Sequence, residues 1–374
     1  MTRLPYVLLL TGIGLASWFS ATAEAKELPS FDTEQAAWNA THVVVASEGE
    51  VIDGRLDVLE SWKGDLKAGQ TIEIAELKQF LPVAARSIDR RFSFNGDRRA
   101  GIPQVVSCQR MVLFLVRNQA ADGKESPVWQ SAITIGPHRL PMTVSVAWLE
   151  GEEAFAVQQP QNPGLALLMP LTRSAKEFRT FVEQVISRQR EIGEIANEDD
   201  RGLRAAGYRR HVEAKSFFVR TAAFHGISQC GDAAIPVLRD ILKDEALIRV
   251  HGEAVKSLAQ TKGIDAVPIL VELIDGELTF WKETAPGLPV GWWNGTGGDA
   301  IRQEYLRSRY GRVVQAVFAL DRNPDPRAAE VVTNLRDFWR SLPQLDDRSG
   351  LNQISESCTS LLKKLSPNRQ QPGH

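Results

Sequence analysis

Cysteine is scarce in this sequence, which holds only three cysteines among 374 residues. They are Cys108, Cys230 and Cys358, an odd number scattered along the whole chain. Small domains held together by disulfides need a dense and even set of cysteines, so the chain does not belong to that class. One disulfide is still compatible with an oxidising compartment, and the spacing leaves the choice of pair open.

Short catalytic and cofactor-binding motifs are also missing. The sequence contains no HExxH, CxxC or GxSxG motif, no Walker loop and no dinucleotide-binding glycine fingerprint. Three histidines, His211, His225 and His251, fall on or near expected helices, but their spacing matches no metal-binding motif. We therefore expect no metal ion and no cofactor, and we favour a non-enzymatic protein over an enzyme.

Neither sign of charge is in large excess, because the chain has 44 basic and 46 acidic residues and a net charge of −2. A chain with this balance has no overall field that attracts nucleic acid or anionic membranes, so nucleic acid is not an expected partner. One local concentration of basic side chains contains Arg90, Arg91, Arg98 and Arg99, within residues 85–101. It is either a loop that docks an anion or a partner, or a solvated loop, which is the usual state of arginine.

Long apolar runs are confined to the beginning of the chain. Arg3 precedes the apolar stretch LPYVLLLTGIGLASWF, and two small-x-small cleavage sites follow, after Ala23 and after Ala25. This pattern predicts a signal peptide over residues 1–25, and hence a periplasmic or secreted protein. The alternative is a membrane anchor, but the run is slightly short for a span of about 20 residues. No later stretch is apolar enough, so no stable membrane span is expected after cleavage.

Most of residues 26–170 consists of short segments in which apolar and polar residues alternate. The segments THVVVASE, GRLDVLESW, TIEIAEL, QRMVLFLVRN and TVSVAWLEGEEAFAVQQ have this character, and Gly-rich or charged turns separate them. Short strands at this spacing are typical of all-β barrels and sandwiches. The pattern predicts an all-β domain over residues 26–170.

The first strands of this domain resemble a known module. The segment VVVASEGEVIDGRLDVLESWKGDLKAGQTIEI is similar to the start of the OB-like barrels of netrin-type modules and tissue inhibitors of metalloproteinases. The segment CQRMVLFLV is similar to a later strand of those barrels. The resemblance implies an OB-like β-barrel with a binding role. The cysteines that hold those modules together are mostly missing here, so inhibitor activity does not follow.

Residues 171–202 are expected to connect two domains. The stretch LTRSAKEFRTFVEQVISRQREI has apolar residues at helical spacing, and Ser174 with Glu177 forms a capping box at its start. The polar stretch ANEDDRG follows and is typical of an exposed linker. The segment is therefore predicted to be a connecting helix and a linker.

The C-terminal half repeats one phrase. AIPVLRDIL and AVPILVELI each follow a helical segment and a Gly break, and their prolines Pro236 and Pro268 are 32 positions apart. Proline is tolerated in the first turn of a helix, where its missing N–H has no intrahelical partner to lose. Asp232 and Asp265 are the expected caps of these helices. Hairpins of this kind stack because none can bury its apolar face alone, so the repeat predicts an α-solenoid.

The repeated phrases resemble HEAT repeats of the short bacterial kind. The resemblance implies HEAT-like hairpins over residues 203–366, with a third unit at residues 309–339 and a capping helix, LNQISESCTSLLKKL. Residues 367–374 are expected to form a disordered tail. The chain as a whole is thus expected to be an α+β multidomain protein. HEAT arrays mostly present a surface to other proteins, so the resemblance implies a scaffold.

A Trp-rich insertion at residues 275–298 interrupts the repeats. It holds Phe280, Trp281, Trp292 and Trp293 among glycines and prolines. Trp is favoured at binding hot spots and stacks on sugar rings, so the insertion is interpreted as a recognition loop for a protein or a carbohydrate. The other interpretation is a loop that folds back and buries its tryptophans, as large aromatic side chains usually do.

These patterns favour an exported protein-interaction or scaffold protein, with a protein partner in the cell envelope or extracellular space. Recognition is expected through the solenoid and the Trp-rich insertion. Two alternatives stay open at this point. One is an enzyme with a dispersed active site at the domain junction, and the other is a carbohydrate-binding protein that uses the Trp-rich insertion.

Overall fold

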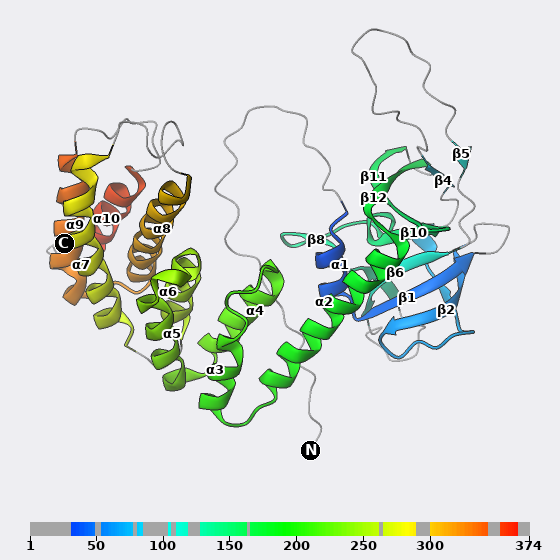
Figure 1. Ribbon diagram of the computed structural model, residues 1–374, viewed down its shortest axis with the longest axis horizontal. Coiled ribbons are helices and arrows are strands. Elements are labelled where there is room, and N and C mark those ends of the chain that lie inside the picture. Colours follow the sequence, from blue (N-terminus) through cyan, green and yellow to red (C-terminus); the bar gives the residue numbers. More distant parts are fainter. Residues whose placement is uncertain are drawn as a thin grey trace, which may run out of the picture. The chain divides into compact units, whose positions relative to one another are not determined.

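A computed structural model of the chain has an α+β architecture, with an N-terminal, mainly antiparallel sheet followed by a series of helices (Figure 1). Contacts within the chain divide it into two compact units, Met1–Arg190 and Glu191–His374, here called unit 1 and unit 2. The structure describes residues 31–48, 54–77, 81–84, 104–105, 110–118, 128–162, 165–261, 265–288, 300–342 and 352–365.

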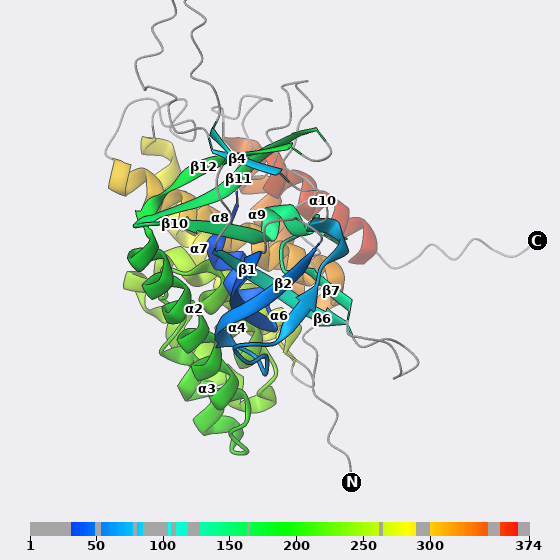
Figure 2. The same cartoon turned by 90° about the vertical axis from the view of Figure 1, so that its right-hand side faces the viewer.

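The main sheet of unit 1 has the strand order β3-β2-β1-β6-β10-β11-β12-β4-β5, and β7 pairs with β6 beside β10. Neighbouring strands are antiparallel, except that β12 and β4 are parallel. Figure 2 shows this succession across the sheet from β2 to β4. The strands are β1 (His42–Glu48), β2 (Arg55–Lys63), β3 (Thr71–Glu73), β4 (Leu81–Ala84), β5 (Gln104–Val105), β6 (Met111–Asn118), β7 (Val128–Ser131), β10 (Val146–Glu150), β11 (Glu153–Asn162) and β12 (Leu165–Ser174). A separate hairpin joins β8 (Thr134–Ile135) to β9 (His138–Arg139).

Strands β1 and β6 are central, and both of their faces are buried. In their register Val44 lies opposite Leu113, and on the other edge of β6 Leu113 pairs with Val146 of β10 while Leu115 pairs with Ser131 of β7. Strands covered on both faces read as continuous apolar runs, and this explains VVVA in β1 and MVLFL in β6. Strand β2 lies nearer the edge of the sheet, and its buried and exposed side chains alternate, with Leu56 and Val58 buried between exposed residues.

One face of the sheet carries an apolar core. Two short 3-10 helices, η1 (Ala75–Leu77) and η2 (Met142–Ser145), pack beside it, and the backbone N–H of Met142 donates to Glu76 Oε2 at 2.6 Å. The members of this core are Val44, Ala46, Leu56, Val58, Ile72, Ile74, Leu77, Met111, Leu113, Leu115, Trp129, Met142, Val144, Val146, Trp148 and Phe155.

Helices α1 (Thr33–Asn39) and α2 (Ala175–Ala196) meet the opposite face of the sheet in unit 1 (Figure 1). Phe114 of β6 points to that face, with its ring 5.8 Å from Phe31 and 6.3 Å from Phe178 of α2. The two helices are joined where Gln189 Nε2 donates to the carbonyl of Trp38 at 2.6 Å. This face therefore has a second apolar layer, built around Phe114.

The predicted capping box at the start of α2 is confirmed. The backbone N–H and hydroxyl of Ser174 both donate to Glu177 Oε2 at 2.9 Å, and the N–H of Glu177 donates to Ser174 Oγ at 3.3 Å. The expected linker after α2 is short, because α2 ends at Ala196 and the next helix begins at Arg201. Asp200 caps that helix by accepting from the N–H of Leu203 at 2.9 Å.

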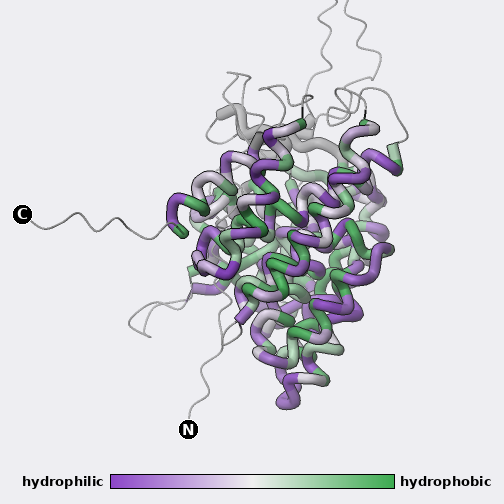
Figure 3. Tube along the Cα trace, turned by 90° about the vertical axis from the view of Figure 1, so that its left-hand side faces the viewer, coloured by the Kyte–Doolittle hydropathy of each residue, from purple (hydrophilic) through white to green (hydrophobic). Residues whose placement is uncertain are grey.

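Unit 2 is helical, and most of its alternate helices along the chain are spatial neighbours. Helix α4 packs on α6, α6 on α8 and α8 on α10, while α3 contacts α5 and α7 contacts α9. Figure 3 shows hydrophobic and hydrophilic residues alternating along these helices, as expected where each helix buries one side. The helices are α3 (Arg201–Arg209), α4 (Phe217–Ser228), α5 (Ala234–Lys243), α6 (His251–Gln260), α7 (Val267–Thr284), α8 (Ala300–Arg322), α9 (Ala329–Ser341) and α10 (Asn352–Leu365). Short 3-10 turns occur at η3 (Gly231–Ala233), η4 (Glu245–Val250), η5 (Ala285–Gly287) and η7 (Pro326–Ala328).

The repeated phrase opens α5 and α7 as predicted, with Pro236 and Pro268 in their first turns. Asp265 Oδ1 accepts from the N–H of Val267 at 3.2 Å, but the N-cap residue of α7 is Ala266, and no side chain caps the helix from that position. The predicted cap at Asp232 is wrong, because this residue lies in η3 and α5 begins without a side-chain cap.

The predicted interruption of the repeats from residue 275 onward is also wrong. Helix α7 continues from there to Thr284, because buried residues keep their helical spacing through Leu278 and Trp281. The segment that opens the predicted Trp-rich insertion is therefore helical. The next helix, α8, begins at Ala300, close to residue 298, where the predicted insertion ends.

Several predictions concern residues outside the described part of the chain. They include the signal peptide at residues 1–25, the arginine-rich segment at residues 85–101 and the tail at residues 367–374. Cys108 also lies there, whereas Cys230 and Cys358 are free and buried. In the described part of the chain, no helix combines the length and the apolar character needed to cross a membrane.

Candidate functional site

The structure separates the residues of the predicted recognition loop. Phe280 and Trp281 lie in α7, whereas Trp292 and Trp293 are outside the described residues. Trp281 is fully buried, and its ring centroid is 5.3 Å from that of Trp339 in α9. Its prediction as a binding contact is wrong, because the ring fills the interface between α7 and α9. The carbohydrate-binding alternative rests on the two tryptophans that the structure does not describe.

The predicted arginine site cannot be placed in the same way. Arg90, Arg91, Arg98 and Arg99 all fall outside the residues that the structure describes. The anion-docking interpretation of this segment therefore stays a prediction.

Phe280, unlike Trp281, is only partly buried and borders a cluster of charged side chains. The guanidinium of Arg309 in α8 lies 3.7 Å from the centre of the Phe280 ring, and the ring of Tyr305 meets Phe280 edge-on at 6.2 Å. A cation over an aromatic face is attracted by the ring quadrupole, more strongly where water is excluded. Phe280 thus helps to fix the position of Arg309.

The centre of this cluster is Glu277 of α7, whose side chain is 2% exposed. Two arginines of α8 bind its carboxylate. Arg309 donates through Nη2 to Oε1 at 2.8 Å and through Nε to Oε2 at 3.3 Å, and Arg312 Nη2 also donates to Oε1. The side chains of Arg309 and Arg312 are 12% and 5% exposed. A carboxylate and two guanidinium groups are thus held together away from water.

His251 extends the cluster into α6. Arg312 Nη1 donates to His251 Nδ1 at 2.7 Å, so the hydrogen of the neutral ring resides on Nε2, which donates to the carbonyl of Asp244 at 3.0 Å. The side chain is fully buried, and this burial, together with the Arg312 charge, lowers the pKa of His251. The histidine therefore acts as a neutral acceptor for Arg312.

Towards the surface the cluster ends at Glu245 of η4. Its carboxylate is half exposed, lies 3.5 Å from Arg309 Nη1, and accepts from the hydroxyl of Tyr305 at 3.1 Å. With His251 neutral, two carboxylates balance two guanidinium groups. We call Glu245, His251, Glu277, Arg309 and Arg312 the buried charge cluster, and it connects η4, α6, α7 and α8.

Sequence reasoning missed this cluster, although one signal was present. Glu277 occupies the buried face of α7 between Ile274 and Leu278, and Arg312 sits among buried valines of α8. Charged residues on an apolar stripe require a partner. The pairing itself joins residues 35 positions apart in the chain, so helical periodicity could not identify it.

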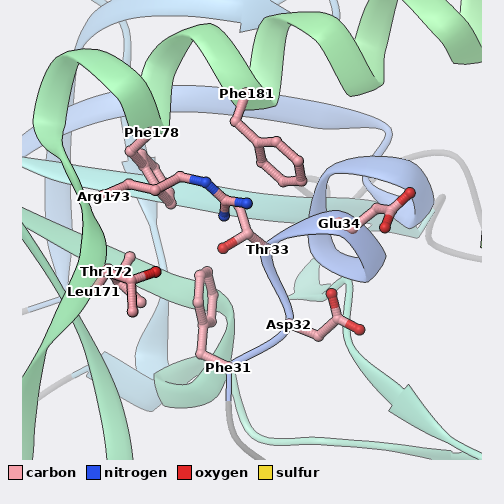
Figure 4. A pocket seen from close by; sticks show the side chains of 9 residues that line it. All are labelled: Phe31, Asp32, Thr33, Glu34, Leu171, Thr172, Arg173, Phe178 and Phe181. Atoms are coloured by element: carbon pink, nitrogen blue, oxygen red, sulfur yellow. The ribbon is translucent and has the colours of Figure 1, made fainter. Parts of the chain in front are cut away.

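Unit 1 contains a pocket between the start of α1 and the junction of β12 with α2 (Figure 4). Its volume is about 360 Å³, near the lower end of the range of about 300–1,000 Å³ for small-molecule sites. It is lined by Phe31, Asp32, Thr33, Glu34, Leu171, Thr172, Arg173, Phe178 and Phe181.

The pocket brings opposite charges onto facing walls. Figure 4 shows the Arg173 side chain reaching across the pocket, with Asp32 and Glu34 on the α1 side. The Arg173 guanidinium lies 4.0 Å from the centre of the Phe181 ring. Asp32 Oδ1 caps α1 by accepting from the N–H of Gln35 at 3.0 Å. The arrangement can bind a ligand that carries two groups. One is an anionic group that accepts hydrogen bonds from Arg173, and the other is a cationic group that meets Asp32 and Glu34.

A second polar group of unit 1 surrounds His42 at the start of β1. His42 Nε2 lies 2.6 Å from Asp65 Oδ1, its Nδ1 lies 2.9 Å from Thr41 Oγ1, and Arg117 Nη1 binds Asp65 at 3.1 Å. The His42 hydrogen bond holds the pKa of Asp65 below its usual value. Thr41 Oγ1 is also bonded to the β6 backbone, so the group holds the β2–β3 loop against β1.

The described parts of both units contain no preformed metal-binding site. No group of three or more His, Cys, Asp or Glu side chains among those residues is arranged to hold an ion. Burial lowers the pKa of Lys63 to about 8, but its Nζ donates to the carbonyl of Ala37 at 3.2 Å and so fastens β2 to α1.

Comparisons with protein-family models, with curated proteins and with solved structures gave no match to this chain. The function has to be inferred from the arrangement of the residues themselves.

Proposed function

We propose that this chain is an exported, non-enzymatic protein-interaction module, with an OB-like barrel in unit 1 and a short HEAT-like solenoid in unit 2. The observation that carries the proposal is the packing of alternate helices, with α4, α6, α8 and α10 in one series. In a solenoid each hairpin contacts only its neighbours, and the outer side chains remain available for a partner.

The exposed sides of α5, α7 and α9 are the proposed contact surface. These helices carry exposed polar residues, including Asp240, Asp275 and Asp337. Their apolar residues, such as Leu238 and Leu335, are buried against the other helices. A protein partner in the envelope or extracellular space would meet these outer side chains. Trp292 and Trp293, which follow α7 in the chain, are the remaining candidates for aromatic anchors.

The proposal can be tested by site-specific photocrosslinking in the native cell. A photoreactive amino acid would replace Asp240, Asp275 or Asp337, and a matched control would replace the exposed Lys67 of the β2–β3 turn. We expect one shared partner at the three positions of unit 2 and none at Lys67. Unrelated products at the three positions, or the same product at Lys67, would contradict a specific surface on unit 2.

A further inference from the structure

We infer that the pocket of unit 1 binds a small zwitterion with an apolar body, of the kind that a free amino acid or a short peptide provides. This binding site is separate from the surface proposed on unit 2. It depends on three features of the pocket, which are an available cation, carboxylates on the opposite wall and aromatic rings between them.

The cation is Arg173 at the end of β12. Its guanidinium packs on the Phe181 ring, which holds it in place while its N–H groups stay at the edge of the stack. Beside the hydrogen bonds from Ser174, its charge helps to lower the pKa of Glu177, but none of the described residues accepts a hydrogen bond from it or forms an ion pair with it within 4.0 Å. The side chain is exposed to solvent. A planar guanidinium in this state is suited to a carboxylate, which it can bind through two parallel hydrogen bonds.

The carboxylates are those of Asp32 and Glu34 at the start of α1. Asp32 uses Oδ1 for the cap of α1, and Glu34 has no hydrogen-bond donor or ion-pair partner among the described residues. With Arg173, the lining has one basic and two acidic side chains. A simple anion would meet net repulsion in such a pocket. A ligand that carries both an ammonium group and a carboxylate can pair its ammonium group with Asp32 or Glu34 and its carboxylate with Arg173.

The apolar body is suggested by Phe31 and Phe181, which are partly exposed, whereas Phe178 is fully buried. Phe178 is buried and held edge-on against Phe114 at 6.3 Å, so this wall is anchored in the core of unit 1. Phe31 also packs on Phe114, at 5.8 Å. Pockets for small molecules combine such apolar walls with a few polar groups that orient the ligand. The volume of about 360 Å³ limits the ligand to a small molecule.

The test is isothermal titration calorimetry on the full chain with four probes. L-phenylalanine carries both charges, N-acetyl-phenylalanine lacks the ammonium group, phenylalaninamide lacks the carboxylate, and phenylalanyl-phenylalanine places the two charges further apart. We expect L-phenylalanine or the dipeptide to bind at least tenfold more tightly than either single-charge probe. Tighter binding of the amino acid identifies a free amino acid as the ligand class, and tighter binding of the dipeptide identifies a peptide terminus.

Two substitutions connect this binding to the pocket. Arg173→Gln should weaken binding of the better probe at least tenfold, and Glu34→Gln should weaken it by a smaller factor. Arg188→Gln, which changes an exposed arginine elsewhere on α2, is the matched control and should leave the affinity unchanged. Thermal melting of each variant verifies that unit 1 is folded.

Three results would overturn the inference. They are the absence of binding by all four probes at millimolar concentration, equal affinity for N-acetyl-phenylalanine, and undiminished affinity in folded Arg173→Gln. Each is independent of the photocrosslinking on unit 2, because the two experiments concern different units. The pocket can therefore fail while the interaction surface stands, and the reverse also holds.

Discussion

The two units of this chain treat charged side chains in opposite ways. The core on one face of the unit 1 sheet is apolar, and the Arg–Glu pairs among the described residues of that unit, such as Glu60 with Arg110, lie at its surface. Unit 2 instead buries Glu277 with Arg312 among its helices. Exposed pairs contribute little to stability, whereas removal of one partner of a buried pair leaves an uncompensated charge. The packing of helices in unit 2 thus includes specific buried polar contacts.

A physical reason for this difference lies in the kind of element that each unit uses. In the sheet, backbone hydrogen bonds already set the register of neighbours, as between Val44 and Leu113. Stacked helices satisfy their backbones internally, so side chains alone decide how they align. We interpret the buried charge cluster as a device that selects one alignment of α6, α7 and α8. The predictions that follow test this difference between the units.

The largest effect is expected for Glu277→Gln. The substitution keeps the shape of the side chain but leaves Arg309 and Arg312 without their shared carboxylate. Loss of one partner from a buried ion pair costs about 3–5 kcal/mol. Hydrogen exchange during denaturant unfolding should show this loss in unit 2 and no change in unit 1. Glu272→Gln, an exposed change in the same helix, is the control, and equal stability of the two variants would show that the cluster is dispensable.

A smaller effect, confined to unit 1, is expected for Gly64→Ala. Gly64 has φ +94°, and a Cβ there would lie 2.2 Å from Cδ2 of the buried His42. Backbone strain of this kind costs about 1–3 kcal/mol, and the clash adds to it. Gly69→Ala is a matched control in the same turn, because Gly69 has φ +84° but open space around it. Chemical denaturation should find Gly64→Ala the less stable of the two. Equal losses would mean that His42 moves aside freely.

The smallest effect is a pH dependence of unit 2. Burial and the Arg312 charge hold the pKa of His251 below the ordinary value of 6.5. The unfolded chain therefore takes up this proton first, and stability falls as the pH drops below 6.5 towards the lowered pKa. Above 6.5 both states are neutral and the contribution is constant. Protonation would also place an N–H at Nδ1 against the N–H of Arg312, while Glu245 is the nearby carboxylate that opposes this effect.

Thermal melting between pH 7.5 and pH 5 measures this dependence. The melting temperature of unit 2 should fall in the wild type and in His225→Gln, which changes a partly exposed histidine of α4. His251→Gln should be less stable at neutral pH but should show a flatter profile. An unchanged slope in His251→Gln would assign the acid sensitivity to other groups.

Local patterns predicted the elements of this fold well. Strand positions in β1, β2 and β6, the capping box of Ser174 and Glu177, and the prolines that open α5 and α7 could all be identified from the sequence. Each depends on side chains within a few positions of one another. The cap at Asp232 failed for a related reason, since a 3-10 turn intervened before α5.

The candidate sites were largely beyond such reasoning. Trp281 was expected in a recognition loop, but in the structure it lies in α7 and its ring packs against that of Trp339. The charge cluster unites residues of four elements, and the pocket unites residues near position 32 with residues near position 173. Composition and periodicity do not encode which distant segments meet.

The sequence by itself determined the order of the two structural classes along the chain, the alternation of the strands and the recurrence of the helical phrase. Tertiary structure alone decided that Phe31 and Arg173 share a pocket and that Glu277 meets Arg312. Periodicity and capping arise from interactions between near neighbours, so the local sequence specifies them. Contacts between distant residues form only when apolar faces pack, and many sequences with the same pattern would bring different partners together.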